Sequence, residues 1–103
     1  MSFNPNQDHS ITLPAAAAMT KAYRDANPGA RLGGFFGKDA LIAILNQTNC
    51  VGLKFYFAED NNGETTLALV GAEENQDDMV SGLLAEGSLP DPPFIAPPNS
   101  LNS

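Results

Sequence analysis

Two runs of alternating residues, joined by a short polar segment, constrain this chain more than any other feature. Residues 51–59 (VGLKFYFAE) and 65–73 (TTLALVGAE) are rich in aromatic and β-branched side chains, and their large residues alternate. Residues 60–64 (DNNGE) supply the asparagines and the glycine that tight turns use. The pattern predicts an antiparallel β-hairpin.

Two registers of this hairpin are compatible with the turn. A two-residue loop over residues 62–63 would pair Phe57 with Ala68. A three-residue loop over residues 61–63, ending on a left-handed glycine, pairs Phe57 with Leu67. The second register gathers the large apolar residues on one face, and burial of such a face fixes register. We therefore expect the three-residue loop and a buried face formed by Leu53, Phe55, Phe57, Leu67 and Leu69.

A helix is predicted before the hairpin, over residues 13–26. Thr12 can cap it because its hydroxyl accepts a free backbone N–H of the first turn, and Pro14 suits a first turn, where no donor is needed. The sequence Asn27-Pro28-Gly29 predicts the end of the helix. Small and apolar residues at helical spacing form one face, namely Ala15, Ala18, Met19, Ala22, Tyr23 and Ala26.

Residues 30–37 (ARLGGFFG) predict a glycine-rich loop in which Phe35 and Phe36 are anchored in the core. A second helix is expected over about residues 38–47. It is apolar on nearly every side, so it should be covered on more than one face, in part by a second subunit. Residues 79–86 predict either a third strand or a short helix.

Together these elements predict an α+β fold in a single domain of 103 residues. We expect a flexible lead-in over residues 1–10, a folded core over about 11–86 and an extended proline-rich tail over 87–103. The two N-terminal helices should pack on the antiparallel hairpin, on the face that carries Phe55 and Leu69. Because a core of this size gives little stability and two strands alone are marginal, self-association would be a common remedy.

The charge is unevenly distributed along the chain. All five lysines and arginines lie within residues 1–54, whereas nine of the twelve acidic residues lie within residues 55–103, and the net charge is −7. Such a chain would repel a phosphate backbone, so no nucleic-acid partner is expected, but it could attract a basic protein. No apolar stretch is long enough to cross a membrane and no leader segment is visible, so we expect no membrane partner and a cytoplasmic location.

No motif in the chain supports catalysis or metal binding. The run over residues 33–39 departs from a phosphate-binding loop, because Leu32 stands where a glycine is needed and Asp39 where a serine or threonine is needed. The lone His9 and Cys50 give no metal-ligand spacing, and Cys50 opens an apolar strand, where cysteine is usually a small buried hydrophobe. We therefore expect no enzyme, no metal site and no cofactor.

Three residues are the candidates for a ligand-binding site: Arg24, Lys54 and Tyr56. Arg24 follows Tyr23 on the first predicted helix. Lys54 and Tyr56 share the more polar face of the hairpin, since residues two apart on a strand point to the same side. If the helix packs there, these side chains would form a polar contact site.

Several segments resemble a group of short uncharacterised bacterial proteins. The resemblance covers roughly residues 9–75. It is carried by residues 9–13 (HSITL), Met19, Tyr23-Arg24, Leu45, residues 50–56 (CVGLKFY) and residues 69–71 (LVG). It implies no activity, because that group has no established function.

Three hypotheses about function follow. The first is a non-catalytic, self-associating interaction module, expected as a homodimer that forms through a sheet edge or the apolar second helix. The second is an accessory or inhibitory protein, of the immunity or antitoxin type, that uses its acidic half to bind a basic partner. The third is a small-ligand binder or enzyme that uses a cleft between the glycine-rich loop and the hairpin.

Overall fold

The chain has an α+β fold, seen in a computed structural model that describes residues 2–87, 89–91 and 97–102. Its residues group into two compact units. We call them the sheet unit, which is Met1–Gln7 with Phe36–Ser88, and the helix unit, which is Asp8–Phe35 with Leu89–Ser103. The expected single domain stays a prediction.

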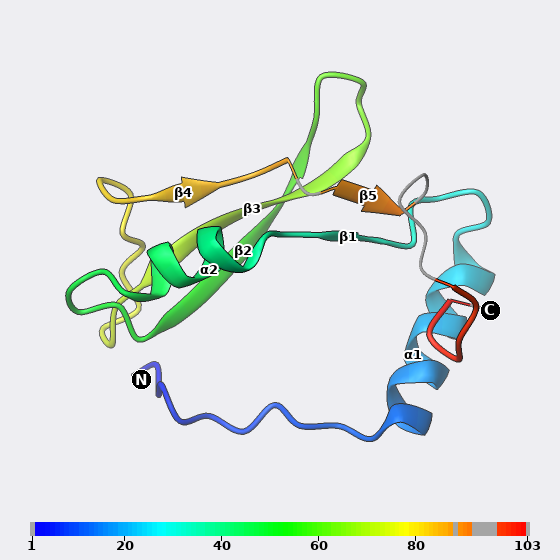
Figure 1. Ribbon diagram of the computed structural model, residues 1–103, viewed down its shortest axis with the longest axis horizontal. Coiled ribbons are helices and arrows are strands. Elements are labelled where there is room, and N and C mark those ends of the chain that lie inside the picture. Colours follow the sequence, from blue (N-terminus) through cyan, green and yellow to red (C-terminus); the bar gives the residue numbers. More distant parts are fainter. Residues whose placement is uncertain (1, 88, 92–96, 103) are drawn as a thin grey trace. The chain divides into compact units, whose positions relative to one another are not determined.

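The sheet unit contains three antiparallel strands in the order β2–β3–β4 (Figure 1). Their bounds are Gly52–Glu59 for β2, Thr65–Ala72 for β3 and Leu84–Ala85 for β4. The strands β2 and β3 are the predicted hairpin, with Phe57 opposite Leu67 and Phe55 opposite Leu69, which confirms the three-residue register. Of the two alternatives predicted for residues 79–86, a strand or a short helix, the structure has a strand, β4.

The turn of the hairpin is held by its first residue. The side-chain Oδ1 of Asp60 accepts the backbone N–H groups of Asn62 at 2.9 Å and of Glu64 at 3.0 Å. Gly63 adopts φ +76°, the left-handed conformation that glycine takes without steric cost. The turn is therefore held by local residues, whereas the sequence prediction chose its register from the expected burial of one face.

The helix α2, Lys38–Leu45, contacts both β2 and β3. It ends two residues before the predicted end, and Gln47 then links the helix to the sheet. The Nε2 of Gln47 donates to the Ile44 carbonyl at 2.9 Å, and its Oε1 accepts the Leu83 N–H at 2.9 Å. Ile44, the most deeply buried large side chain of the described residues, is only 1% exposed.

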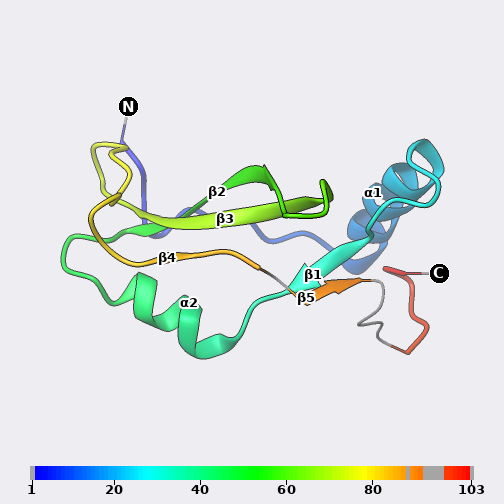
Figure 2. The same ribbon diagram turned by 90° about the horizontal axis from the view of Figure 1, so that it is seen from above.

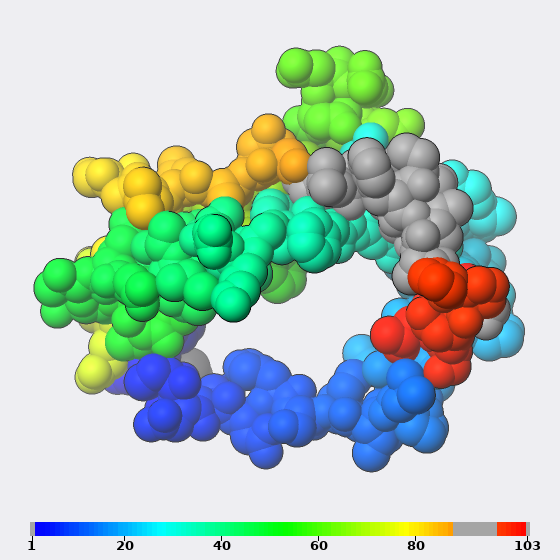
Figure 3. All heavy atoms as spheres, in the orientation of Figure 1, coloured from blue at the N-terminus to red at the C-terminus, as the bar shows by residue number. Residues whose placement is uncertain are grey.

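The expected buried face of the hairpin is buried only in part, which corrects the sequence prediction. Leu69 is 7% exposed, but Phe55 and Phe57 are 57% and 78% exposed. The eight-residue helix is about 12 Å long, whereas an eight-residue strand spans about 27 Å. The helix therefore covers one part of the hairpin, and the hairpin tip extends beyond it (Figures 2 and 3).

The core instead uses both faces of β3. Besides Ile44 and Leu69, the buried residues include Thr66, Val70 and Ala72, which lie on the more polar face of the hairpin, with Lys54 and Tyr56. The N-terminal segment also joins this unit, because the Phe3 N–H donates to the Glu74 carbonyl at 2.8 Å.

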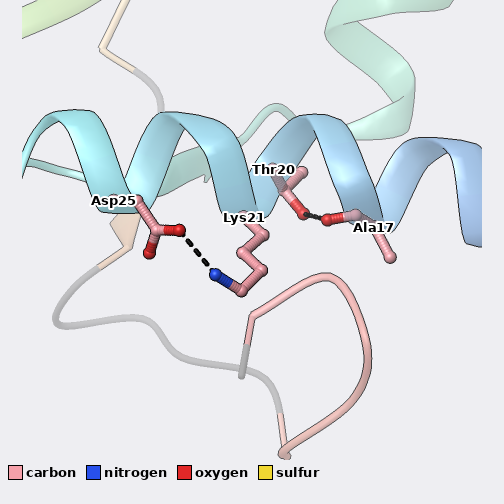
Figure 4. A network of polar contacts seen from close by, with 4 residues as sticks. All are labelled: Ala17, Thr20, Lys21 and Asp25. Atoms are coloured by element: carbon pink, nitrogen blue, oxygen red, sulfur yellow. Dashed lines mark hydrogen bonds and ion pairs between the residues drawn. The ribbon is translucent and has the colours of Figure 1, made fainter.

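The helix unit contains α1, Leu13–Ala26, with the predicted bounds. Thr12 caps it as expected, since its Oγ1 accepts the Ala15 N–H at 3.2 Å. On its exposed side Lys21 and Asp25 form an ion pair one turn apart (Figure 4). The expected packing of α1 on the hairpin stays a prediction.

A second small sheet was missed by the sequence analysis. Strand β1, Gly33–Phe35, lies in the predicted glycine-rich loop, and it pairs antiparallel with β5, Leu89–Asp91, in the predicted tail. Both segments are short and lack alternation, so only their mutual backbone hydrogen bonds define them as strands. The side chain of Phe35 is 62% exposed, which contradicts its expected role as a core anchor.

Candidate functional site

A polar cluster of Lys54, Tyr56 and Asp78 occupies one face of the sheet unit. Lys54 Nζ lies 2.8 Å from Asp78 Oδ1, and Tyr56 Oη donates to Asp78 Oδ2 at 2.5 Å. The Lys54 ammonium also lies 5.1 Å from the centre of the Tyr56 ring, within cation–π range. One carboxylate thus holds two side chains of β2.

The strand register explains how these residues meet. Lys54 lies opposite Val70 on β3, and Asp78 forms a bridge with Ala72 on the other side of the same strand. The Lys54–Asp78 ion pair therefore spans β3, over the side where Val70 and Ala72 are buried. Its side chains are 31% and 23% exposed, which protects the pair from part of the solvent screening.

Both partners of the ion pair are held in their charged forms. The hydrogen bonds from Lys54 and then from Tyr56 lower the pKa of Asp78 below its ordinary value. The same contact with Asp78, followed by that with Tyr56, raises the pKa of Lys54. Such a pair suits a fixed structural contact better than proton transfer near neutral pH.

We expect the stability of the sheet unit to depend on Asp78 at acid pH. The pKa of this carboxyl is lower in the folded chain than the ordinary value of about 3.8, so the ionised group stabilises the fold above pH 4. This contribution is lost as the pH falls from about 4 through the folded pKa. When the free energy of unfolding is measured with urea between pH 2 and 6, Asp78→Asn should reduce its dependence on pH below about pH 4.

The neighbouring Asp77→Asn is the matched control, because Asp77 is exposed in the adjacent turn. In this variant the free energy of unfolding should depend on pH below about pH 4 nearly as it does in the parent chain. Equal flattening by both substitutions would contradict the role assigned to Asp78.

Of the three predicted site residues, the structure brings Lys54 and Tyr56 together. Arg24 lies in the helix unit, where its Nη1 donates to the Leu101 carbonyl at 2.7 Å. It lines a shallow pocket of about 180 Å³ with Met19, Thr20, Tyr23, Leu32 and Leu101. A shared site of Arg24 with the hairpin stays a prediction, as does a cleft between the glycine-rich segment and the hairpin.

Asp78 was missed as a member of the cluster. No basic residue was predicted as its partner. One signal could have identified it: Lys54 is the last basic residue of the chain and lies within an apolar strand, so it needed a nearby acid. Among the described residues, no group of three or more His, Cys, Asp and Glu side chains is placed to hold a metal ion.

The outer edge of β2 is the second notable surface of this unit. In the described part of the chain, β3 is the only strand that pairs with β2. Phe55 and Phe57 project from one side of this edge strand, and their rings form an edge-to-face pair with centroids 5.6 Å apart. Within the described residues, this edge therefore combines unpaired backbone groups with an exposed aromatic pair.

No family model, no curated protein and no solved structure matches the chain. The resemblance to short bacterial proteins stays a prediction. Neither described helix has the length and apolar character needed to span a bilayer.

Proposed function

We propose that this protein is a non-catalytic interaction module that associates with itself as a homodimer. The observation that supports this proposal is the outer edge of β2, which pairs with no other described strand and carries two exposed phenylalanines. We further propose that it acts in a reducing compartment such as the bacterial cytoplasm, which suits its single free cysteine, Cys50.

Edge strands of monomeric proteins usually carry features that block further pairing, such as proline, a bulge or a free lysine. Strand β2 contains no proline, and it pairs with β3 residue for residue along its whole length. Its only lysine, Lys54, is held by Asp78 on the other side of the sheet. These features leave the edge open to another strand.

The aromatic pair adds a driving force. Full burial of a phenylalanine side chain contributes about 1.5–3 kcal/mol relative to exposure. Phe55 and Phe57 are both more than half exposed, so each copy can bury two rings on association. The small core of the sheet unit supplies a further reason, since a larger joint sheet would raise its stability.

The test is the mass in solution. Light scattering at about 100 µM, a concentration that populates a complex of micromolar affinity, should give twice the chain mass of 10.8 kDa. The variant Phe57→Ser should return the mass to that of one chain, because it removes a ring that is 78% exposed. A single-chain mass for the parent protein would contradict the proposal.

Leu84→Ser is the matched control for this experiment. Leu84 is also exposed, at 62%, but it lies on β4, at the opposite edge of the same sheet. The control should leave the dimer intact. Loss of the dimer in both variants would show that the association does not use the β2 edge.

A second function, binding of a basic protein, is favoured by exposed acids in the sheet unit. Glu59 and Glu64 flank the hairpin turn, and Glu74 and Asp77 lie in the turn after β3. A basic probe, for example a lysine decapeptide, should bind with an affinity that falls as salt rises. Absence of binding at low salt would contradict this function.

A further inference from the structure

We infer that the dimer forms by antiparallel pairing of β2 with β2 of a second copy, about a twofold axis at Phe55. The two three-stranded sheets would then join into one continuous sheet. This inference rests on the proposed self-association and adds the site and the register of the contact.

The backbone of β2 limits which residues an added strand can pair with. In an antiparallel pair, hydrogen-bonded and non-hydrogen-bonded residue pairs alternate. The Asp60 N–H donates to the Glu64 carbonyl at 2.9 Å. Asp60 and every second residue before it therefore direct their backbone N–H and C=O groups toward β3. The intervening residues of β2 direct their N–H and C=O groups outward, namely Leu53, Phe55, Phe57 and Glu59. An added strand must pair with these four residues.

The side chains of β2 limit the register of such a pair. The outward N–H and C=O groups of one copy can bond only to the outward groups of the other. In a twofold pair, the axis must therefore pass through a residue of β2, and only a few residues are possible. An axis at Lys54 would place two lysines directly opposite each other, and like charges in that position are destabilising. An axis at Tyr56 would place Leu53 opposite Glu59 of the second copy, which removes an apolar contact.

An axis at Phe57 would likewise place Phe55 opposite Glu59 of the second copy. An axis at Phe55 avoids both mismatches. It places Phe55 opposite its own copy and Leu53 opposite Phe57, so three apolar pairs follow one another on the same face. Aromatic and aliphatic pairs of this kind stabilise a sheet.

The opposite face and the turns agree with this register. Lys54 would lie opposite Tyr56 of the second copy, and its ammonium already contacts a tyrosine ring within its own chain at 5.1 Å. No two like charges are opposed. Because the strands run antiparallel, the two acidic turns, with Asp60 and Glu64, lie at opposite ends of the joint strand pair.

A charge-swap experiment tests the register. Phe55→Lys and Phe55→Glu each place like charges opposite each other at the axis, so each variant alone should dimerise at least about tenfold more weakly than the parent. An equimolar mixture of the two should recover the dimer, because lysine then faces glutamate. Phe55 is 57% exposed, so both variants should keep the fold, which amide NMR spectra of the monomers would check.

The register control is a mixture of Phe55→Lys with Phe57→Glu. It should stay monomeric, and its recovery would indicate an axis at Tyr56 and overturn the inferred register. If the parent is a dimer but the Phe55 pair fails to recover, β2 pairing about Phe55 is wrong and the proposed function stands. A monomeric parent chain would refute the proposed function itself.

A distance measurement gives an independent check. A spin label can be placed at Glu59→Cys in a Cys50→Ser background. With the axis at Phe55, the labelled residues of the two copies would be eight strand residues apart, about 27 Å. An axis at Tyr56 would shorten the backbone separation to about 20 Å, and parallel pairing to about 5 Å. A distance near either shorter value would overturn the inference.

Discussion

Replacing Ile44 with alanine should destabilise the sheet unit by about 2–5 kcal/mol, the usual cost of deleting a buried isoleucine side chain down to its Cβ. Ile44 is 1% exposed and projects from α2, which contacts both long strands of the sheet. The whole stability of a small domain is only about 5–15 kcal/mol. Urea unfolding, followed through the amide NMR signals of β3, would measure the loss.

Ile42→Ala is the matched control for this prediction. It makes the same chemical change in the same helix, but Ile42 is 41% exposed. The helix propensity changes equally in both variants, so the difference between their free energies of unfolding reports burial alone. Ile42→Ala should cost less than about 1 kcal/mol. Equal losses at the two positions would contradict the assignment of Ile44 to the centre of the core.

Gly71→Val should also be strongly unfavourable, because its new side chain has no space. A Cβ atom at Gly71 would lie 3.0 Å from the sulfur of Met79, 3.1 Å from that of Cys50 and 3.1 Å from Gln47 Nε2. Gln47 and Cys50 belong to the segment between α2 and β2, and Met79 approaches from the segment after β3, so these side chains must give way by a few tenths of an ångström. Overpacking of this kind typically costs about 1–3 kcal/mol. The midpoint of urea unfolding should fall accordingly.

Gly52→Val provides a control with the opposite expected sign. Gly52 lies on the neighbouring strand, paired with Ala72, and a Cβ there would meet nothing within 4 Å. Valine favours extended backbone over glycine on a scale that spans about 1 kcal/mol, so this variant should be neutral or more stable. A stability loss at Gly52 that matches the loss at Gly71 would show that backbone conformation is responsible and not crowding.

The features that the sequence predicted well depend on neighbours within a few residues. The bounds of α1 follow from its threonine cap and from the Asn27-Pro28-Gly29 stop, and the hairpin register follows from a turn that Asp60 and Gly63 specify. These interactions are local, so they act before any tertiary contact forms and are visible in the pattern of residues.

The candidate site was predicted in part. Lys54 and Tyr56 were expected on one face of the hairpin, and strand alternation alone places them there. Asp78 completes their cluster only because the chain returns to pair beside Ala72. The turn after β3, which brings Asp78 there, consists of ordinary polar residues. Their sequence does not indicate which residue Asp78 will contact.

The sequence by itself determined where the two helices and the two long strands lie and which residues share a face of the hairpin. It could not decide how much of each face is covered, because coverage depends on the length and position of elements that pack from elsewhere in the chain. In the structure α2 contacts both long strands and Leu69 is buried, but Phe55 and Phe57 stay exposed. Burial is a property of tertiary contacts, and here those contacts leave open the edge on which the proposed association depends.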